Sequence, residues 1–151
     1  MYQRILVGVD GSDAAQQALQ EALALAKVHQ AEVRAVYVLD SSQQVMTFGI
    51  VEAQPLINVL RDTGKKILEQ VAEAARGQGA SIETHLAETM GETGHTAETL
   101  VAAAKDWKAD LIVVGTHGRR GLRRMLIGSV AETVVRMAEL PVLLVHKPAK
   151  A

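Results

Sequence analysis

The stretch ILVGVDGS runs from Ile5 to Ser12. A short apolar run without polar alternation is typical of a strand that is covered on both faces. Asp and Gly are common turn residues, and Ser12 is a favourable N-cap. Apolar residues then recur at helical spacing, at Ala15, Ala18, Leu19, Ala22, Leu23 and Ala26. The stretch therefore predicts a buried central strand that leads into a helix.

The same succession of strand and helix repeats along the chain. Further strands are predicted at Val33–Asp40, Ser81–Ala87, Leu111–Gly115 and Pro141–His146. Further helices are predicted from Pro55 to near Gly77, from about Thr96 to Trp107 and from Ser129 to Leu140, with a looser segment from Ser41 to Ala53. Five strands alternating with four helices predict a doubly wound α/β fold, an open parallel five-stranded sheet in the order 3-2-1-4-5 with helices on both faces.

Length and composition set the class of protein. The 151 residues, 48% of them hydrophobic, are enough for one globular domain, expected at 1–147 with a short tail at 148–151. A net charge of -1 argues against a surface devoted to nucleic acid or membrane, and the absence of cysteine excludes disulfides and thiolate metal sites. No apolar run is long enough for a signal peptide or a membrane span. We expect a soluble, cytoplasmic protein.

The connection after the fourth strand is the candidate binding loop. It reads VGTHGRRGLRRMLIGSVAETVV from Val114 to Val135, and its interval Thr116 to Ile127 exceeds the usual strand-to-helix connection of about two to six residues. Gly115, Gly118 and Gly128 offer positive φ angles and no Cβ, as a backbone wrapped around phosphates requires. Gly128 and Ser129 open a helix whose N-terminus attracts anions. The loop is a candidate phosphate site.

Simpler interpretations of these residues remain open at this stage. Ser129-x-x-Glu132 before an apolar run is also a capping box, in which Ser129 satisfies the N–H groups of its own helix. Asp10 is either a turn former or a polar contact in the crevice beyond the first and fourth strands. The arginines of the loop form a solvated face from which one or two reach phosphate: Arg119, Arg120, Arg123 and Arg124.

Signatures of catalysis are missing from the chain. His117 has no partner carboxylate or hydroxyl at a recognisable spacing, so no general base is predicted. The sequence contains no G-x-G-x-x-G and no P-loop. It also contains no nucleophile elbow, no histidine pair at metal-ligand spacing and no paired catalytic carboxylates. The sequence indicates a binding protein, with no catalytic residue and no metal ligand assigned to its side chains.

One spacing is specific to a known family. Gly115-x-x-Gly118, nine residues and then Gly128-Ser129 is similar to the G-2x-G-9x-G-[ST] motif of the ATP-binding branch of the universal stress protein family. The resemblance extends to RILVGVDGS at the start, to VYVLD, to DLIVVGTHGRRGL and to PVLLVH near the end. It implies the adenine nucleotide alpha hydrolase-like form of the doubly wound fold. One departure is Thr96, where many relatives have proline at the start of the third helix.

The resemblance also implies a ligand, a site and an assembly. The ligand is ATP, with Mg²⁺ or Mn²⁺ bound through its phosphates. The implied nucleotide-binding residues are Val9, Asp10 and Val38 at the adenosine end, Val114 and Gly115 near the ribose, and Gly118, Arg119, Gly128, Ser129 and Val130 near the phosphates. Relatives pair through their fifth strands, which implies a homodimer through Val142, Leu143, Leu144 and Val145.

These features lead to three hypotheses about function. The first is a regulatory stress-response protein that binds ATP with little or no hydrolysis, so that bound nucleotide changes the surface offered to other proteins. The second is a slow ATP hydrolase whose arginine loop stabilises a phosphoryl transition state. The third is a dimeric interaction module that does not depend on nucleotide. The absence of an evident base favours the first hypothesis over the second.

Overall fold

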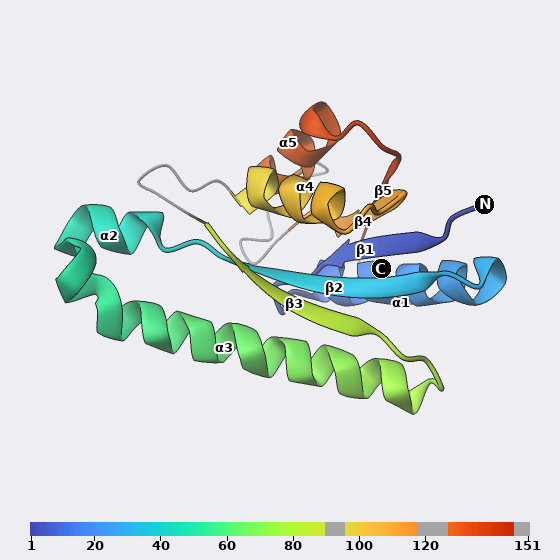
Figure 1. Cartoon of the computed structure of the whole chain (residues 1–151), viewed down its shortest axis with the longest axis horizontal. Coiled ribbons are helices and arrows are strands. Elements are labelled where there is room, and N and C mark those ends of the chain that lie inside the picture. Colours follow the sequence, from blue (N-terminus) through green and yellow to red (C-terminus); the bar gives the residue numbers. More distant parts are fainter. Residues whose placement is uncertain (90–95, 118–126, 147–151) are drawn as a thin grey trace, which may run out of the picture.

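The computed structural model describes residues 1–89, 96–117 and 127–146. Its centre is one parallel sheet of five strands, in the order β3-β2-β1-β4-β5 (Figure 1). The strands are β1 (Arg4–Gly8), β2 (Glu32–Leu39), β3 (Glu83–Glu88), β4 (Leu111–Gly115) and β5 (Val142–Val145). The predicted strand order is confirmed.

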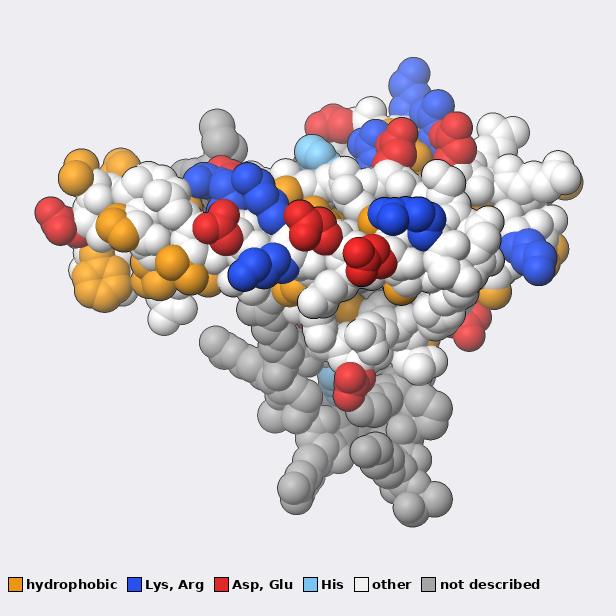
Figure 2. Space-filling model, turned by 90° about the horizontal axis from the view of Figure 1, so that it is seen from below, with side chains coloured by type: hydrophobic (Ala, Val, Ile, Leu, Met, Phe, Trp, Pro, Cys, Tyr) orange, Lys and Arg blue, Asp and Glu red, His pale blue; other side chains and the backbone are white. Residues whose placement is uncertain are grey.

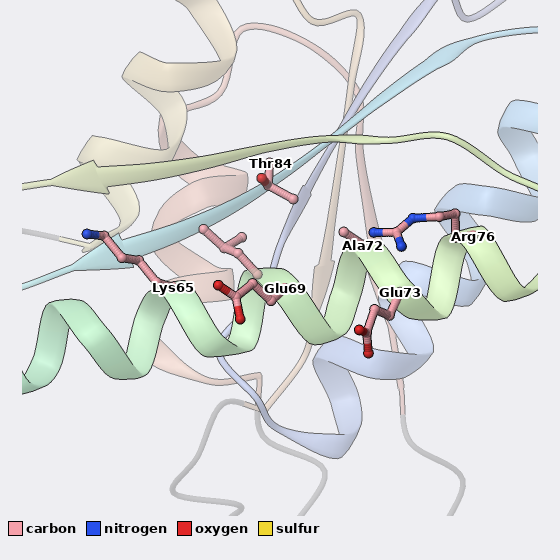
Figure 3. A pocket seen from close by; sticks show the side chains of 7 residues that line it. Lys65, Glu69, Ala72, Glu73, Arg76 and Thr84 are labelled. Carbon is pink, nitrogen blue, oxygen red and sulfur yellow. The ribbon is translucent and has the colours of Figure 1, made fainter.

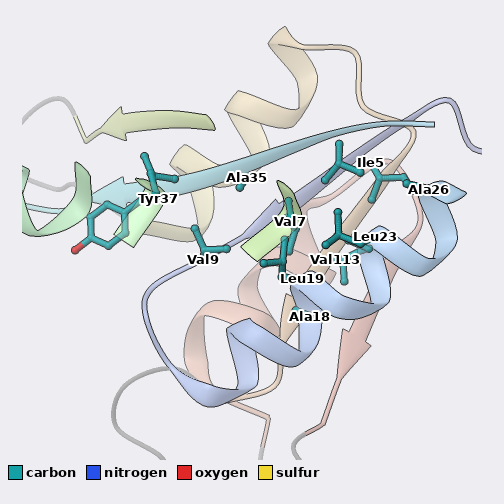
Figure 4. Packing of buried hydrophobic residues seen from close by; sticks show 14 of the residues in the cluster. Ile5, Val7, Val9, Ala18, Leu19, Leu23, Ala26, Ala35, Tyr37 and Val113 are labelled. Carbon is teal, nitrogen blue, oxygen red and sulfur yellow. The ribbon is translucent and has the colours of Figure 1, made fainter. Parts of the chain in front are cut away.

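Helices cover both faces of this sheet, as the continuous apolar runs of β1 and β4 predict. On one face lie α1 (Asp13–His29) and α3 (Ile50–Gly77), and on the other lie α4 (Thr96–Asp106) and α5 (Ser129–Met137) (Figure 1). Alternate residues of each strand point to opposite faces, so Ile5 and Val7 pack with α1 while Leu6 packs with α4. Figure 4 shows the first of these two clusters, with Ala18, Leu19 and Leu23 of α1 turned toward the sheet.

The start of α1 follows the sequence prediction. The Ser12 hydroxyl accepts a hydrogen bond of 3.1 Å from the Ala15 amide, which makes Ser12 the N-cap. The buried face of the helix is rich in alanine, at positions 14, 15, 18, 22 and 26. Small side chains let the helix axis lie close to the strands.

The segment after β2 differs from the prediction. The stretch expected to be loose contains α2 (Ser42–Phe48), and α3 begins at Ile50, before the expected start at Pro55. Gly49, with φ of +81°, separates the two helices. The sequence pattern missed α2 because this helix buries none of its residues and so shows no apolar periodicity. Pro55 is tolerated inside α3 at the loss of one backbone hydrogen bond.

Close packing fixes α3 against the sheet. A Cβ built on Gly64 would lie 2.6 Å from a ring carbon of Tyr37 and 3.0 Å from Leu86, so only glycine allows this approach.

The last helix, α5, ends at Met137, three residues earlier than predicted, and Ala138 is already extended. In the part of the chain that the structure describes, no helix is long and apolar enough to cross a bilayer.

Candidate functional site

The strand order reverses between β1 and β4, and their carboxyl ends border the candidate crevice. A Cβ built on Gly115, the last residue of β4, would lie 2.8 Å from both the carbonyl carbon and the Cβ of Ala14 in α1. The first turn of α1 therefore touches the end of β4, and a side chain at Gly115 would separate them. The structure thus brings the end of β4 against the helix that follows β1, beside the crevice that the strand order predicts.

Strand pairing shows where Val9, Asp10 and Val38, the residues predicted to line the adenosine end, lie along the sheet. Val7 is paired with Val113, so Val9 lies level with Gly115 two residues further along each chain. Gly8, the last residue of β1, is paired with Val36, and Val38 lies two residues further along β2. Val9 and Asp10 therefore follow β1 at the carboxyl side of the sheet, where the neighbouring strands β2 and β4 also end. Val9 itself is buried, and its amide donates to the Val36 carbonyl at 2.9 Å.

Asp10 forms the turn between β1 and α1. Its Oδ1 accepts a hydrogen bond of 2.8 Å from the Ser12 amide, and Gly11 between them has φ of +83°. This is an Asx-turn, in which the side chain stands in for a backbone carbonyl. The turn-forming interpretation of Asp10 is therefore confirmed for one carboxylate oxygen. Contact with a ligand remains a proposal.

Thr116 connects the end of β4 to two other elements. It is completely buried; its amide donates to the Val145 carbonyl at 3.0 Å, and its hydroxyl lies 3.2 Å from Nδ1 of His146. Its own carbonyl accepts a hydrogen bond of 2.6 Å from the Gly128 amide. Thr116 was not selected from the sequence, because the glycine motif leaves its position undefined. Val114, two residues before Thr116, is buried in the core beside α4 and α5.

The start of α5 corrects two sequence-based interpretations. Gly128 is the N-cap, with φ of -61° and ψ of 156°, so the capping-box reading of Ser129 is wrong. Glu132 pairs with Arg136 at 2.9 Å, within the helix and away from its start. The expectation of positive φ is also wrong for Gly115, which lies in a strand, and for Gly128, which has negative φ; for Gly118, which lies outside the described residues, it stays a prediction.

What glycine supplies at position 128 is the absence of a side chain. A Cβ there would lie 2.9 Å from the Thr116 carbonyl oxygen, inside contact distance. The two helix caps differ. In α1 the Ser12 hydroxyl accepts a hydrogen bond from one of the first amides of the helix, whereas in α5 the cap has no side chain that could accept one. Helix N-termini carry partial positive charge and unpaired N–H groups. The exposed Ser129 and Val130 at this terminus make it suited to an anion such as phosphate.

Part of the predicted site is outside the described residues. Gly118 and Arg119 lie there, as do the other three arginines of the loop, Arg120, Arg123 and Arg124. Within the residues 1–89, 96–117 and 127–146, no group of three His, Asp or Glu side chains is placed to hold a metal ion.

A separate groove of about 400 Å³ lies between α3 and β3. Figure 3 shows Lys65, Glu69, Glu73 and Arg76 along α3, with Thr84 on the facing strand. Charged side chains of both signs line it, which is typical of a solvated helix face. The groove lies along the outer edge of the sheet, away from the crevice between β1 and β4, and we assign no ligand to it.

The doubly wound sheet, with a glycine-capped helix at its switch point, places the protein among α/β proteins that bind ligands beyond the carboxyl ends of their strands. Residues 1–146 match the universal stress protein family, and the chain belongs to this family. It is 39% identical to a universal stress protein of Methanocaldococcus jannaschii, over 99% of this chain and 85% of the relative. It is 36% identical to universal stress protein YxiE of Bacillus subtilis, over 97% and 100% of the two chains.

Two solved structures of relatives contain nucleotides. A universal stress protein in complex with cAMP superposes with a TM-score of 0.71 and 30% identity, over 97% of this chain and 99% of the other. A universal stress protein from Archaeoglobus fulgidus in complex with dAMP gives a TM-score of 0.66 and 28% identity, over 95% and 98%. Nucleotide binding therefore occurs among proteins that share this fold and family.

Proposed function

We propose that this protein binds ATP in the cytoplasm and acts as a regulatory stress-response protein with little or no hydrolysis. The observation that carries the proposal is the cap of α5. Gly128 has no side chain, its amide is held by Thr116, and the helix that follows presents its positive end at the crevice. The cAMP and dAMP complexes of two relatives support an adenine nucleotide as the ligand.

The proposed site divides along the nucleotide. Val9, Asp10 and Val38 would line the adenosine end; Val9 and Asp10 directly follow β1, and Val38 lies near the end of the neighbouring β2, which supports this proposal. Val114 and Gly115 would lie near the ribose. Main-chain N–H groups of Ser129 and Val130 would bind phosphate, helped by Gly118 and Arg119 as the sequence motif implies. Mg²⁺ or Mn²⁺ would be held through the phosphates and would neutralise part of their charge.

Identification of the retained nucleotide is the most direct test. The purified protein is denatured and the released small molecules are identified by mass spectrometry, and protein stripped of nucleotide is then titrated with ATP, ADP and cAMP in a calorimeter with and without Mg²⁺. We expect ATP with Mg²⁺ to bind most tightly. If no adenine nucleotide is retained and none produces heat at millimolar concentration, the proposal is wrong.

A dimeric interaction module is the alternative, favoured by the position of β5. This strand pairs with β4 on one side and forms an edge of the sheet on the other. Open strand edges readily pair with another chain. We propose a homodimer through Val142–Val145 in either case. The two functions differ in their response to nucleotide, because only the regulatory protein changes its surface when ATP binds.

A further inference from the structure

An apolar surface with few charges projects from one end of the molecule. In Figure 1, α2 and the first turns of α3 extend beyond the carboxyl end of β2, away from the sheet and the helices packed on its two faces. The two helices pack on each other, yet six of their large apolar side chains stay exposed: Met46 at 75%, Phe48 at 56%, Ile50 at 73%, Val51 at 81%, Leu56 at 41% and Val59 at 60%. We call these six residues the α2–α3 patch. Figure 2 shows apolar side chains gathered at this end.

The distribution of these residues around α3 is unusual for a surface helix. A surface helix normally carries one apolar stripe toward the core, and here Ala53 and Ile57 supply that stripe. Val51, Leu56 and Val59 lie on other sides of the same turns. Exposed polar residues, Glu52, Gln54 and Asn58, lie on the same turns. The start of α3 therefore carries apolar side chains on its exposed sides as well as toward the core, interspersed with these polar residues.

Charge is nearly absent from the surface. From Ser41 to Leu60 the sequence contains a single charged residue, Glu52, although 22% of the whole chain is charged. In a two-fold interface each surface meets its own copy, so charges near the axis would face like charges. A surface without them is self-complementary. The lack of Lys and Arg here also removes the attraction that peripheral proteins use to bind anionic membranes.

The exposed area matches what a stable pair requires. With residue areas of about 200 Å² each, the fractional exposures of these apolar residues correspond to roughly 770 Å² of surface. A standard interface buries about 800 Å² per partner, and apolar patches on monomers are usually about 300–600 Å². We propose that the α2–α3 patch binds the same patch of a second copy of this chain, at an interface separate from the edge of β5.

The chain offers a matched control for this proposal. Val28 in α1 is also a helical valine, it is 79% exposed against 81% for Val51, and it lies outside the patch. The chain has no cysteine of its own, so a single introduced thiol reports contact between copies without background. Val51→Cys and Phe48→Cys are compared with Val28→Cys for disulfide-linked dimer under mild oxidation at micromolar concentration. We expect at least one patch variant to cross-link at least tenfold faster than the control.

A second pair of variants tests the same contact in solution. Each variant replaces an exposed valine by a charged residue that suits the helix dipole. Val51→Glu puts a negative charge in the first turn of α3, and Val28→Lys puts a positive charge in the last turn of α1. Sedimentation equilibrium should show a lower average mass for Val51→Glu than for wild type, and no change for Val28→Lys, with circular dichroism melts confirming folding. Equal cross-linking of the Val51, Phe48 and Val28 thiols would overturn the proposal. The proposal would also be overturned if wild-type protein bound phosphatidylcholine vesicles in flotation while neither Val51→Cys nor Phe48→Cys formed a cross-linked dimer.

Discussion

The amide nitrogen of Gly128 donates a hydrogen bond of 2.6 Å to the carbonyl oxygen of Thr116. This bond joins the start of α5 to the end of β4. Thr116 is in turn fixed by Val145 and His146 at the end of β5, so the start of the helix is tied to the last strand of the sheet. A side chain at position 128 would have to displace a residue that has no room to move.

Replacing Gly128 by valine should therefore weaken nucleotide binding. The new Cβ would lie 2.9 Å from the Thr116 carbonyl oxygen, which is too close for contact. The start of α5, which we propose to bind phosphate, would therefore have to move. We expect affinity for Mg-ATP to fall at least about tenfold, or roughly 1.4 kcal/mol, in calorimetric titration. Gly77→Val is the control, because a Cβ at position 77 meets nothing within 4 Å. A folded Gly128→Val protein with wild-type affinity would contradict the assignment.

Two substitutions at Asp10 should separate its turn from its proposed ligand contact. Asp10→Asn keeps an oxygen to accept the Ser12 amide but replaces the second carboxylate oxygen by an NH₂ group. We expect ATP affinity to fall by about three- to tenfold, the effect of one hydrogen bond, in protein that circular dichroism melts show to be folded. Asp10→Ala, which also removes the acceptor of the Ser12 amide, should lower ATP affinity and the melting temperature more than Asp10→Asn does. Wild-type affinity in Asp10→Asn would restrict this residue to its turn.

Turnover should be far below that of ordinary enzymes. The site offers main-chain donors for phosphate, and we assign no general base in it, so ATP hydrolysis should be much slower than about 1 per second. Phosphate release is measured at saturating Mg-ATP over several hours. Several turnovers per second, abolished by Gly128→Val in folded protein, would instead support the hydrolase hypothesis.

Proline in β5 should disrupt pairing between chains. The amides of Ile112 and Thr116 in β4 donate hydrogen bonds to the carbonyls of Pro141 and Val145, so these two residues point their main-chain groups toward β4. Because successive residues of a strand point their N–H and C=O groups to opposite sides, those of Val142 and Leu144 point to the open edge of the sheet. Leu144→Pro removes an outward N–H group, whereas Leu144→Ala truncates the side chain and keeps that group. We expect sedimentation equilibrium to give half the mass for the proline variant relative to the alanine variant. Equal masses would exclude this strand as the interface.

Gly64 should be essential for packing of α3. Alanine favours helices over glycine by about 1 kcal/mol, but its Cβ would meet the Tyr37 ring at 2.6 Å. The overpacking should win and destabilise the protein by about 1–3 kcal/mol in urea unfolding. Gly77→Ala, at the open end of the same helix, should be neutral or stabilising. A stabilised Gly64→Ala variant would show that the sheet and helix separate easily.

The strands and their order could be predicted because burial on both faces leaves a local signature. Runs such as ILVGV and LIVVG are continuous in apolar residues, and alternation with helices restricts the connections to a few topologies. The Ser12 cap follows from a local rule, and the proximity of the ends of β1 and β4 follows from the predicted strand order. By contrast, α2 was missed because it buries no residue, so its helical state has no apolar pattern to reveal it.

The roles of individual site residues depended on contacts between distant segments. Ser129-x-x-Glu132 has a capping-box pattern, yet the cap is Gly128, because the Thr116 carbonyl holds the amide of residue 128 and no Cβ fits there. Thr116 itself is defined by partners 12 and 30 residues further along the chain, Gly128 and His146. Local patterns specify which residues can form strands, turns and caps. Which of them meet at the crevice depends on strand register and close packing, since these bring together residues that the chain keeps far apart.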